Sequence, residues 1–185
     1  MYHIKNDKRA QASAELICAG LLACMKEKPF ARITITDVQH ASTVSRSTFY
    51  RNFDCLEDVL ALLCDRGFQA VFSEYNALPP AQRGSLAKAV FQYWFRNSAV
   101  LEALVQIHRT DILFDSLRRS SGLIQALQPM ADDPARFDYF VAIITSSMIG
   151  VLTVWVEHGK TETEDQMVQK LTSAFIEMAI LELPG

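Results

Sequence analysis

The stretch ITITDVQHASTVSRSTFYRNFDCLEDVL, residues 33–60, decides how this chain folds. Thr34 and Asp37 have the T-x-x-D spacing of a capping box, which predicts a short helix from the next residue to about position 41. Ser45 can cap a second short helix. Only residues 42–44 separate the two predicted helices, and this spacing is typical of a helix-turn-helix unit.

The second predicted helix carries the residue types that read DNA. In a helix-turn-helix protein this helix lies in the major groove with its first turn at the base edges. Arg46 and Ser47 fall in that turn, and an arginine can donate two hydrogen bonds to guanine O6 and N7. The hydroxyl and amide groups around them suit phosphate oxygens, while Val44, Phe49 and Phe53 are spaced to pack inward. The residues predicted to contact DNA are Thr34, Thr36, Ser45, Arg46, Ser47, Thr48, Tyr50, Arg51 and Asn52.

Helical periodicity also dominates the rest of the chain, and no strand pattern with hairpin turns is found in it. The sequence therefore predicts an all-α fold. Two prolines and a glycine interrupt any helix in residues 76–85, and Gly159 is placed to end the longest helix. The other helices are expected at about residues 7–26, 55–75, 85–96, 98–107, 111–127, 135–158 and 163–183.

Two domains are expected from this pattern: a helix-turn-helix DNA-binding domain at residues 1–54 and a helical effector-binding and dimerisation domain at residues 55–185. The charge also differs slightly along the chain. Residues 1–58 hold eight basic and seven acidic side chains, a net charge of +1, whereas the remainder holds ten and fourteen, a net charge of −4. A total of −3 argues against a protein that coats nucleic acid, but it allows a small basic face.

Composition also indicates the cellular compartment. The four cysteines, at positions 18, 24, 55 and 64, form no CxxC pair and have no histidine cluster nearby, which predicts a reduced, cytoplasmic protein without a metal site. The N-terminal residues lack the apolar core of a signal peptide. Residues 139–156 carry no charge, and we interpret them as a helix buried by protein rather than a membrane span.

The long helix at residues 135–158 predicts assembly. One apolar stripe can face its own domain, while Ala142, Ser146 and Gly150 form a second stripe of small residues four apart. An uncharged second face favours a two-fold, four-helix interface with the last helix; a fully internal pair of core helices is the alternative. The predicted interface residues are Ala142, Ser146, Gly150, Val154, Phe175, Ile176 and Ile180.

Large apolar residues in the body could line a pocket for an apolar or aromatic small-molecule effector, although core packing is the commoner role of such residues. The candidates are Phe91, Trp94, His108, Phe114, Tyr139, Met148 and Trp155. The sequence has no P-loop, GxGxxG, HExxH or GxSxG motif, so neither an enzyme nor a cofactor is expected.

Residues 33–60 resemble the DNA-binding signature of TetR/AcrR-type transcriptional repressors. The resemblance rests on the threonine-capped helix, the valine after the turn, the S-T-F-Y run and the aliphatic start of the next helix. Beyond about residue 60 it extends only to the helix count and to a long penultimate helix that ends in W-x-x-x-G, residues 155–159. It implies a homodimeric, ligand-responsive repressor of a palindromic operator, with a three-helix head and a divergent body that binds a small inducer.

Three positions depart from the family pattern. Ser42 and Thr43 replace the usual alanine and glycine in the turn, and a threonine with positive φ is strained. Leu56 replaces a lysine that contacts phosphate, and Gln39 replaces a small alanine. These departures motivate an alternative reading, in which the chain is a helical dimeric ligand-binding or interaction module that has lost specific DNA binding.

Overall fold

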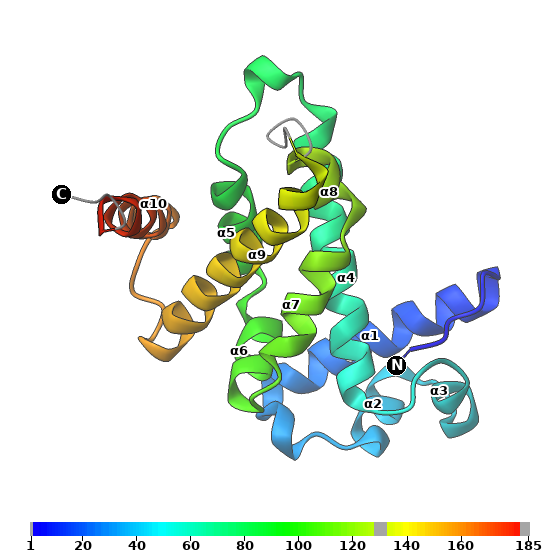
Figure 1. Cartoon of the computed structure of the whole chain (residues 1–185). Helices are drawn as coiled ribbons and strands as arrows, with labels where there is room; N and C mark the ends of the chain where they lie inside the picture. Colours follow the sequence, from blue (N-terminus) through cyan, green and yellow to red (C-terminus); the bar gives the residue numbers. More distant parts are fainter. Residues whose placement is uncertain (1, 128–132, 182–185) are drawn as a thin grey trace.

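The computed structural model describes residues 2–127 and 133–181. Within these residues the chain is entirely helical and has no strand, as the periodicity predicts (Figure 1). The elements in chain order are α1 (Lys8–Glu27), η1 (Phe30–Arg32), α2 (Ile35–Ser42), α3 (Arg46–Asn52), α4 (Leu56–Ala77), η2 (Pro80–Gln82), α5 (Leu86–Arg96), α6 (Ser98–Gln106), α7 (Thr110–Arg119), α8 (Ser121–Leu127), α9 (Pro134–Glu157) and α10 (Glu164–Leu181).

Side-chain caps start the two short helices where the sequence predicts them. At α2, Asp37 N–H donates to Thr34 Oγ1 at 3.2 Å and Thr34 N–H donates to Asp37 Oδ2 at 2.7 Å, which completes the capping box. At α3, Ser45 Oγ accepts from Thr48 N–H at 3.3 Å. Thr43 ends α2 in the left-handed conformation, with φ of 57°. The helix-turn-helix prediction is therefore confirmed, including its unfavourable threonine.

Two further left-handed residues end helices of the body. Gly159, with φ of 78°, follows α9, and the next residue, Lys160, donates its N–H to Trp155 O at 2.8 Å. His108, with φ of 57°, follows α6 in the same way, with Arg109 N–H bonded to Leu104 O. These contacts are those of a Schellman cap, which satisfies the last carbonyl groups of a helix. The expected glycine cap of α9 is confirmed.

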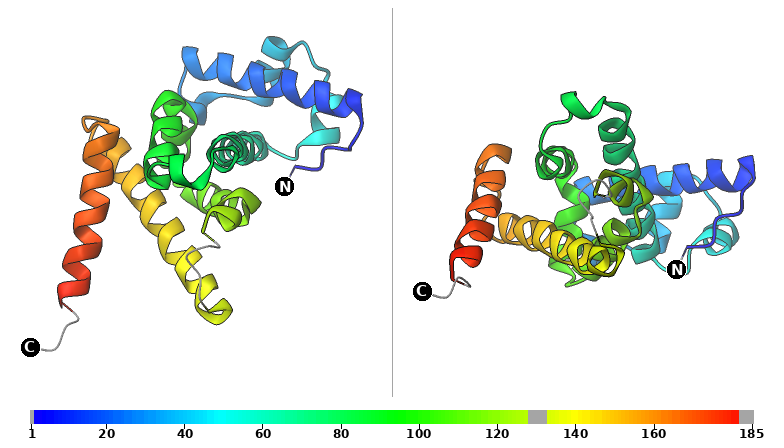
Figure 2. Two further views of the ribbon diagram at one scale, coloured as in Figure 1. Left: turned by 90° about the horizontal axis from the view of Figure 1, so that it is seen from above. Right: turned by 45° about the horizontal axis from the view of Figure 1, so that its top comes forward.

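The helices form a head, a body and an outlying helix. Helices α1 to α3 lie beside the first turns of α4, whereas α4 to α9 make up the body (Figure 1). Helices α1 and α2 pack closely in the head. A Cβ added at Gly20 of α1 would come within 2.8 Å of Ser42 Cβ in α2, so only glycine fits there. Helix α10 packs against α5 near its start and diverges from α9 (Figure 2).

One continuous hydrophobic core joins the head to the body. Leu21 and Phe49 of the head belong to the same buried cluster as Leu60 of α4 and Trp94 of α5. Helix α4 carries this continuity because its first turns pack under the head and its later turns pack under the body. Helix α4 is therefore in contact with both the head and the body.

The structure adds elements that periodicity did not reveal. The helix expected at residues 111–127 is divided at Ser120, where the backbone becomes extended, into α7 and α8. Gly122 of α8 lies against Phe72 of α4 so closely that an added Cβ would meet Phe72 Cβ at 2.3 Å. The predicted loop at residues 128–134 and the predicted end of the last helix, at Leu183, lie partly or wholly outside the described residues.

Candidate nucleic-acid interface

Helix α3 is anchored by its apolar face and presents its polar face to solvent. Phe49 and Phe53 are almost completely buried, and their ring centroids lie 5.7 Å apart. Tyr50, by contrast, is 42% exposed, and Arg46 and Arg51 are also exposed. The apolar anchors lie four residues apart, so one side of the helix is fixed in the core while the other is free for a ligand.

The exposed face is held in one arrangement by contacts within the helix. Ser45 Oγ lies 3.1 Å from Ser47 Oγ and 2.9 Å from Thr48 Oγ1. The Arg46 guanidinium lies over the Tyr50 ring, 5.5 Å from its centroid, and its Nη2 donates to Tyr50 Oη at 3.4 Å. A cation held over an aromatic face keeps its charge and most of its N–H donors for another partner.

Asn52 is a correction to the predicted contacts. Its side chain is only 1% exposed, and Nδ2 donates to Thr48 O at 2.8 Å inside the helix. Its buried Oδ1 has no hydrogen-bond partner. Asn52 therefore faces the core and does not reach a phosphate group in this conformation.

The two threonines predicted on α2 differ in their surroundings. Thr34 Oγ1 both accepts from Asp37 N–H and donates to Asp37 Oδ2, so its hydroxyl is used by the capping box. Hydrogen bonds from Lys28, 2.7 Å away, and from Thr34 hold the pKa of the Asp37 carboxyl far below its usual range. Thr36 is exposed on the first turn of α2.

A basic groove beside α3 was missed from the sequence. Lys5 and Arg9, from the start of the chain, line a hollow of about 180 Å³ together with Thr48 and Arg51 of the recognition helix. Asp7 also lines it, but its side chain accepts from Ala10 N–H as the cap of α1. The signal available in the sequence was the group of basic residues just before and at the start of α1.

Leu56, which stands where the family resemblance expects a lysine, is a packed residue. It is 9% exposed and borders a surface hollow with Phe30 of η1 and Ile107, the residue that follows α6. Its position is therefore part of the contact between the head and the body.

A second hollow lies in the body, on the opposite end of α4 from the head. It has a volume of about 480 Å³ and is formed by the later turns of α4 together with α7 and α8. Polar side chains dominate its lining. The lining residues are Asp65, Gln69, Phe72, Ser73, Asn76, Ser116, Arg119, Ser120, Ser121, Gly122 and Gln125.

None of the seven residues predicted to bind an effector lines this cavity. Helical periodicity turns the larger ones inward: the buried members are Phe91, Trp94, Met148 and Trp155. Phe114 is half-buried, whereas His108 and Tyr139 are exposed. His108 is explained by the cap that ends α6.

The outer faces of α9 and α10 expose a large apolar surface. Val141, Met148 and Leu152 of α9 are buried against the body, as their stripe predicts. The opposite side carries the predicted interface residues: Ala142 and Phe175 are half-buried, while Ser146, Gly150, Val154, Ile176 and Ile180 are exposed. Tyr139, Ile143 and Met178 are exposed on the same two helices. By length and composition the segment Arg136–Glu157 could also cross a membrane, with a mean hydropathy of 1.9.

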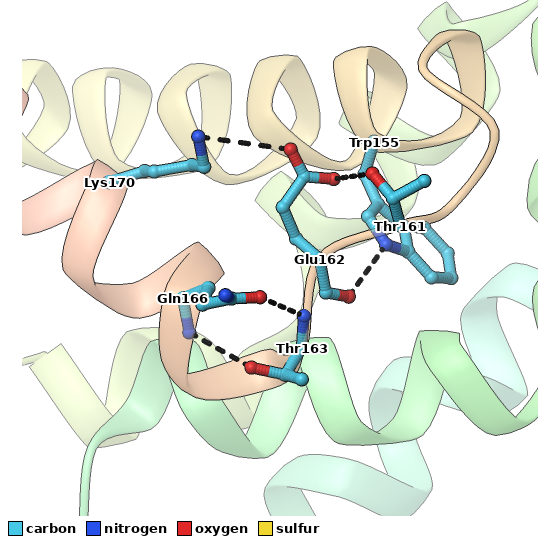
Figure 3. A network of polar contacts seen from close by, with 6 residues as sticks. All are labelled: Trp155, Thr161, Glu162, Thr163, Gln166 and Lys170. Atoms are coloured by element: carbon cyan, nitrogen blue, oxygen red, sulfur yellow. Dashed lines mark hydrogen bonds and ion pairs between the residues drawn. The ribbon is translucent and has the colours of Figure 1, made fainter.

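The connection between α9 and α10 fixes the start of α10 (Figure 3). Trp155 Nε1 donates to Glu162 O at 3.2 Å, and the Trp155 ring stacks on Phe95 of α5 at 3.9 Å. Thr163 N–H donates to Gln166 Oε1 at 2.8 Å, a further side-chain cap. These contacts hold the start of α10 against α9 and α5.

The cysteines show no sign of reactivity. All four are free, and burial raises the pKa of each thiol, to about 11 for Cys18. The thiolate is the nucleophilic form, so these side chains remain unreactive at neutral pH. No cluster of metal-binding side chains was found among the described residues.

The fold and the polar recognition helix define a helix-turn-helix protein with a separate helical body. A family model described as the C-terminal region of transcriptional regulators, TetR_C_8, matches residues 85–177, half of the chain. The chain belongs to the TetR family of transcriptional regulators, which bind DNA and are not enzymes.

Solved structures support the same fold. Lin0861 from Listeria innocua is 17% identical with a TM-score of 0.73, and the match covers 95% of this chain and 96% of that chain. A TetR-family regulator from Syntrophomonas wolfei is 18% identical with a TM-score of 0.65, at coverages of 94% and 97%. A TetR regulator from Streptococcus agalactiae is 19% identical with a TM-score of 0.60, at 91% and 96%. Comparison with curated proteins finds no match.

Proposed function

We propose that this protein is a ligand-responsive, cytoplasmic repressor that binds a palindromic DNA operator as a homodimer. The observation that carries the proposal is the orientation of α3, which buries Phe49 and Phe53 and exposes Arg46, Tyr50 and Arg51. In the major groove, Arg46 and Ser47 would contact base edges. Tyr50, Arg51 and Thr48 would donate hydrogen bonds to phosphate oxygens, together with Lys5 and Arg9 of the basic groove.

The homodimer is proposed from the exposed apolar faces of α9 and α10. Ile176 and Ile180 are more than half exposed, and Val154 is 46% exposed. Ser146 and Gly150 are small, exposed residues of α9 at a four-residue spacing with Val154, which permits two helices to approach closely. Two copies of this pair would form a four-helix interface with two-fold symmetry, and two recognition helices would then meet a palindrome about one DNA turn apart.

The effector is proposed to bind in the polar cavity between α4, α7 and α8. Helix α4 lines this cavity and also carries the core of the head. A ligand that prefers one position of α4 would therefore shift the population of head positions, and with it the operator affinity.

The direct test is to retain pooled random DNA duplexes on the purified protein at low salt and to sequence those that stay bound. We expect enrichment of a palindrome. Retention without any enriched palindrome would reject the repressor proposal and favour the alternative of a helical ligand-binding or interaction module.

A further inference from the structure

The segment before α1 connects the recognition helix to the wall of the cavity. Tyr2 Oη donates to Asp65 Oδ2 of α4 at 2.5 Å. The next residue, His3, donates its backbone N–H to Asn52 O, at the end of α3, at 3.0 Å, and its ring Nε2 lies 3.4 Å from Tyr50 O. The start of the chain lies beside both α3 and α4 (Figure 1). Two consecutive residues, Tyr2 and His3, therefore connect the end of α3 in the head to α4 of the body.

Asp65 is shared between this link and the cavity. Its Oδ1 accepts a hydrogen bond from Ser116 Oγ of α7, and Arg119 Nη2 lies 3.8 Å from the same oxygen. Asp65, Ser116 and Arg119 all line the cavity. Burial, followed by the Asp65 contact, raises the pKa of Tyr2 to about 12, so the phenol keeps the proton that it donates.

The cavity lining is matched to a small molecule with both charges. It has one carboxylate, Asp65, with 27% of its side chain exposed, and one guanidinium, Arg119, with 53% exposed. The other polar lining groups are neutral amides and hydroxyls, and Phe72 is the one aromatic residue among those that line it. Asp65 and Arg119 form an ion pair at 3.8 Å. A ligand with one positive and one negative group can separate this pair and still leave neither charge without a partner.

We propose that the cavity binds a small zwitterion of the amino-acid class, with its ammonium group on Asp65 and its carboxylate on Arg119, and that this ammonium competes with Tyr2 for Asp65. This inference rests on the proposed function, because its output is operator affinity. An ammonium group adds the attraction between two opposite charges to its hydrogen bond with Asp65, which a neutral phenol does not supply. Ligand binding would therefore release the N-terminal segment from α4 and remove its support from the end of α3.

The first test uses Tyr2→Phe, which removes only the hydroxyl. Tyr75→Phe is the matched control, because Tyr75 Oη donates to Gly84 O at 3.1 Å, far from the head in sequence. Tyr2→Phe should weaken operator binding about fivefold or more and should tighten zwitterion binding, because the ligand's ammonium group then has no phenol to displace from Asp65. The control should change neither affinity more than twofold. An unchanged operator affinity in Tyr2→Phe, or a loss of both affinities, would overturn the link.

The second test measures ligand binding without DNA. The twenty free L-amino acids, and the carboxylic acids that lack their amino group, are titrated calorimetrically into the full-length protein. At least one amino acid should bind with a Kd below about 1 mM, its deaminated analogue should not, and Asp65→Asn and Arg119→Gln should each weaken binding at least tenfold. Arg119 is half exposed, so its variant tests the site even if Asp65→Asn fails to fold.

These outcomes separate the two proposals. A wild-type protein that binds an amino acid but enriches no operator contradicts the proposed function alone. A wild-type protein that enriches an operator but binds no amino acid, or binds one equally well in both cavity variants, overturns the zwitterion site.

Discussion

Thr43 has a φ of 57°, in the left-handed region where an L-residue with a β-branched side chain is strained. Thr43 lies in the short turn between α2 and α3. Both helices start at a side-chain cap, and the chain between them passes through this left-handed residue. The turn is therefore retained at a cost in stability, and the polar side chain remains exposed.

We expect Thr43→Gly to raise the free energy of unfolding by about 1 kcal/mol, since glycine adopts this conformation without strain. Thr36→Gly is the matched control, because Thr36 lies within α2, where replacing threonine by glycine should lower stability by about 0.3 kcal/mol. Urea unfolding of both variants measures the difference. If the two substitutions had the same sign, the strain assigned to Thr43 would be incorrect.

Arg46 and Tyr50 are expected to have different roles although they contact each other. Arg46→Ala should relax the base preference at one position in each half-site, because a bidentate contact with guanine discriminates by about 1–3 kcal/mol. Tyr50→Phe should weaken all sequences about equally, because it removes a phosphate donor. Duplex enrichment with each variant gives the comparison. A uniform loss of affinity in both would contradict this division.

At the scale of the element, helix ends could be predicted and side-chain directions only partly so. Caps are local, so Thr34, Ser45 and Gly159 were sufficient to locate the ends of their helices. The inward direction of Asn52 was also present in the sequence, because it lies three residues after Phe49 and shares the face that the core covers. Its polar type suggested the opposite role.

The cavity could not be predicted, because its walls come from helices that are distant in the sequence. Asp65 of α4 meets Ser116 of α7, fifty-one positions away, only after both helices pack. Neither residue belongs to a motif. The sequence analysis instead placed the aromatic residues Phe91 and Trp94 in the effector pocket. Their helical spacing equally predicts the core, which is where they lie.

The basic groove between the N-terminal segment and α3 gives a prediction for salt dependence. Lys5→Gln and Arg9→Gln should each reduce the slope of log affinity against log salt by about one, because each removes one phosphate contact. Lys170→Gln on α10 is the control and should leave the slope unchanged, since Lys170 lies 3.8 Å from Glu162, away from the head. Binding is measured across a salt series. Equal slopes in all three variants would exclude the groove from the interface.

At the scale of the whole molecule, the exposed faces of α9 and α10 predict a dimer. Ile176→Glu should give a monomer, because it places a charge at the centre of the proposed apolar interface. Ile124→Glu on α8 is a matched control: Ile124 is also exposed, by 41%, but lies outside that face. Sedimentation equilibrium distinguishes the two. A dimeric Ile176→Glu variant would place the interface elsewhere.

In the proposed arrangement a recognition helix is anchored by Phe49 and Phe53, the core runs through α4, and two copies of the chain would be joined through α9 and α10. The most direct measurement of it is the mass and affinity of the complex with the enriched duplex, before and after one half-site is scrambled. We predict two chains on the intact palindrome and a loss of affinity of at least a hundredfold on the scrambled one. One chain bound with equal affinity to both duplexes would contradict a dimeric operator-binding regulator.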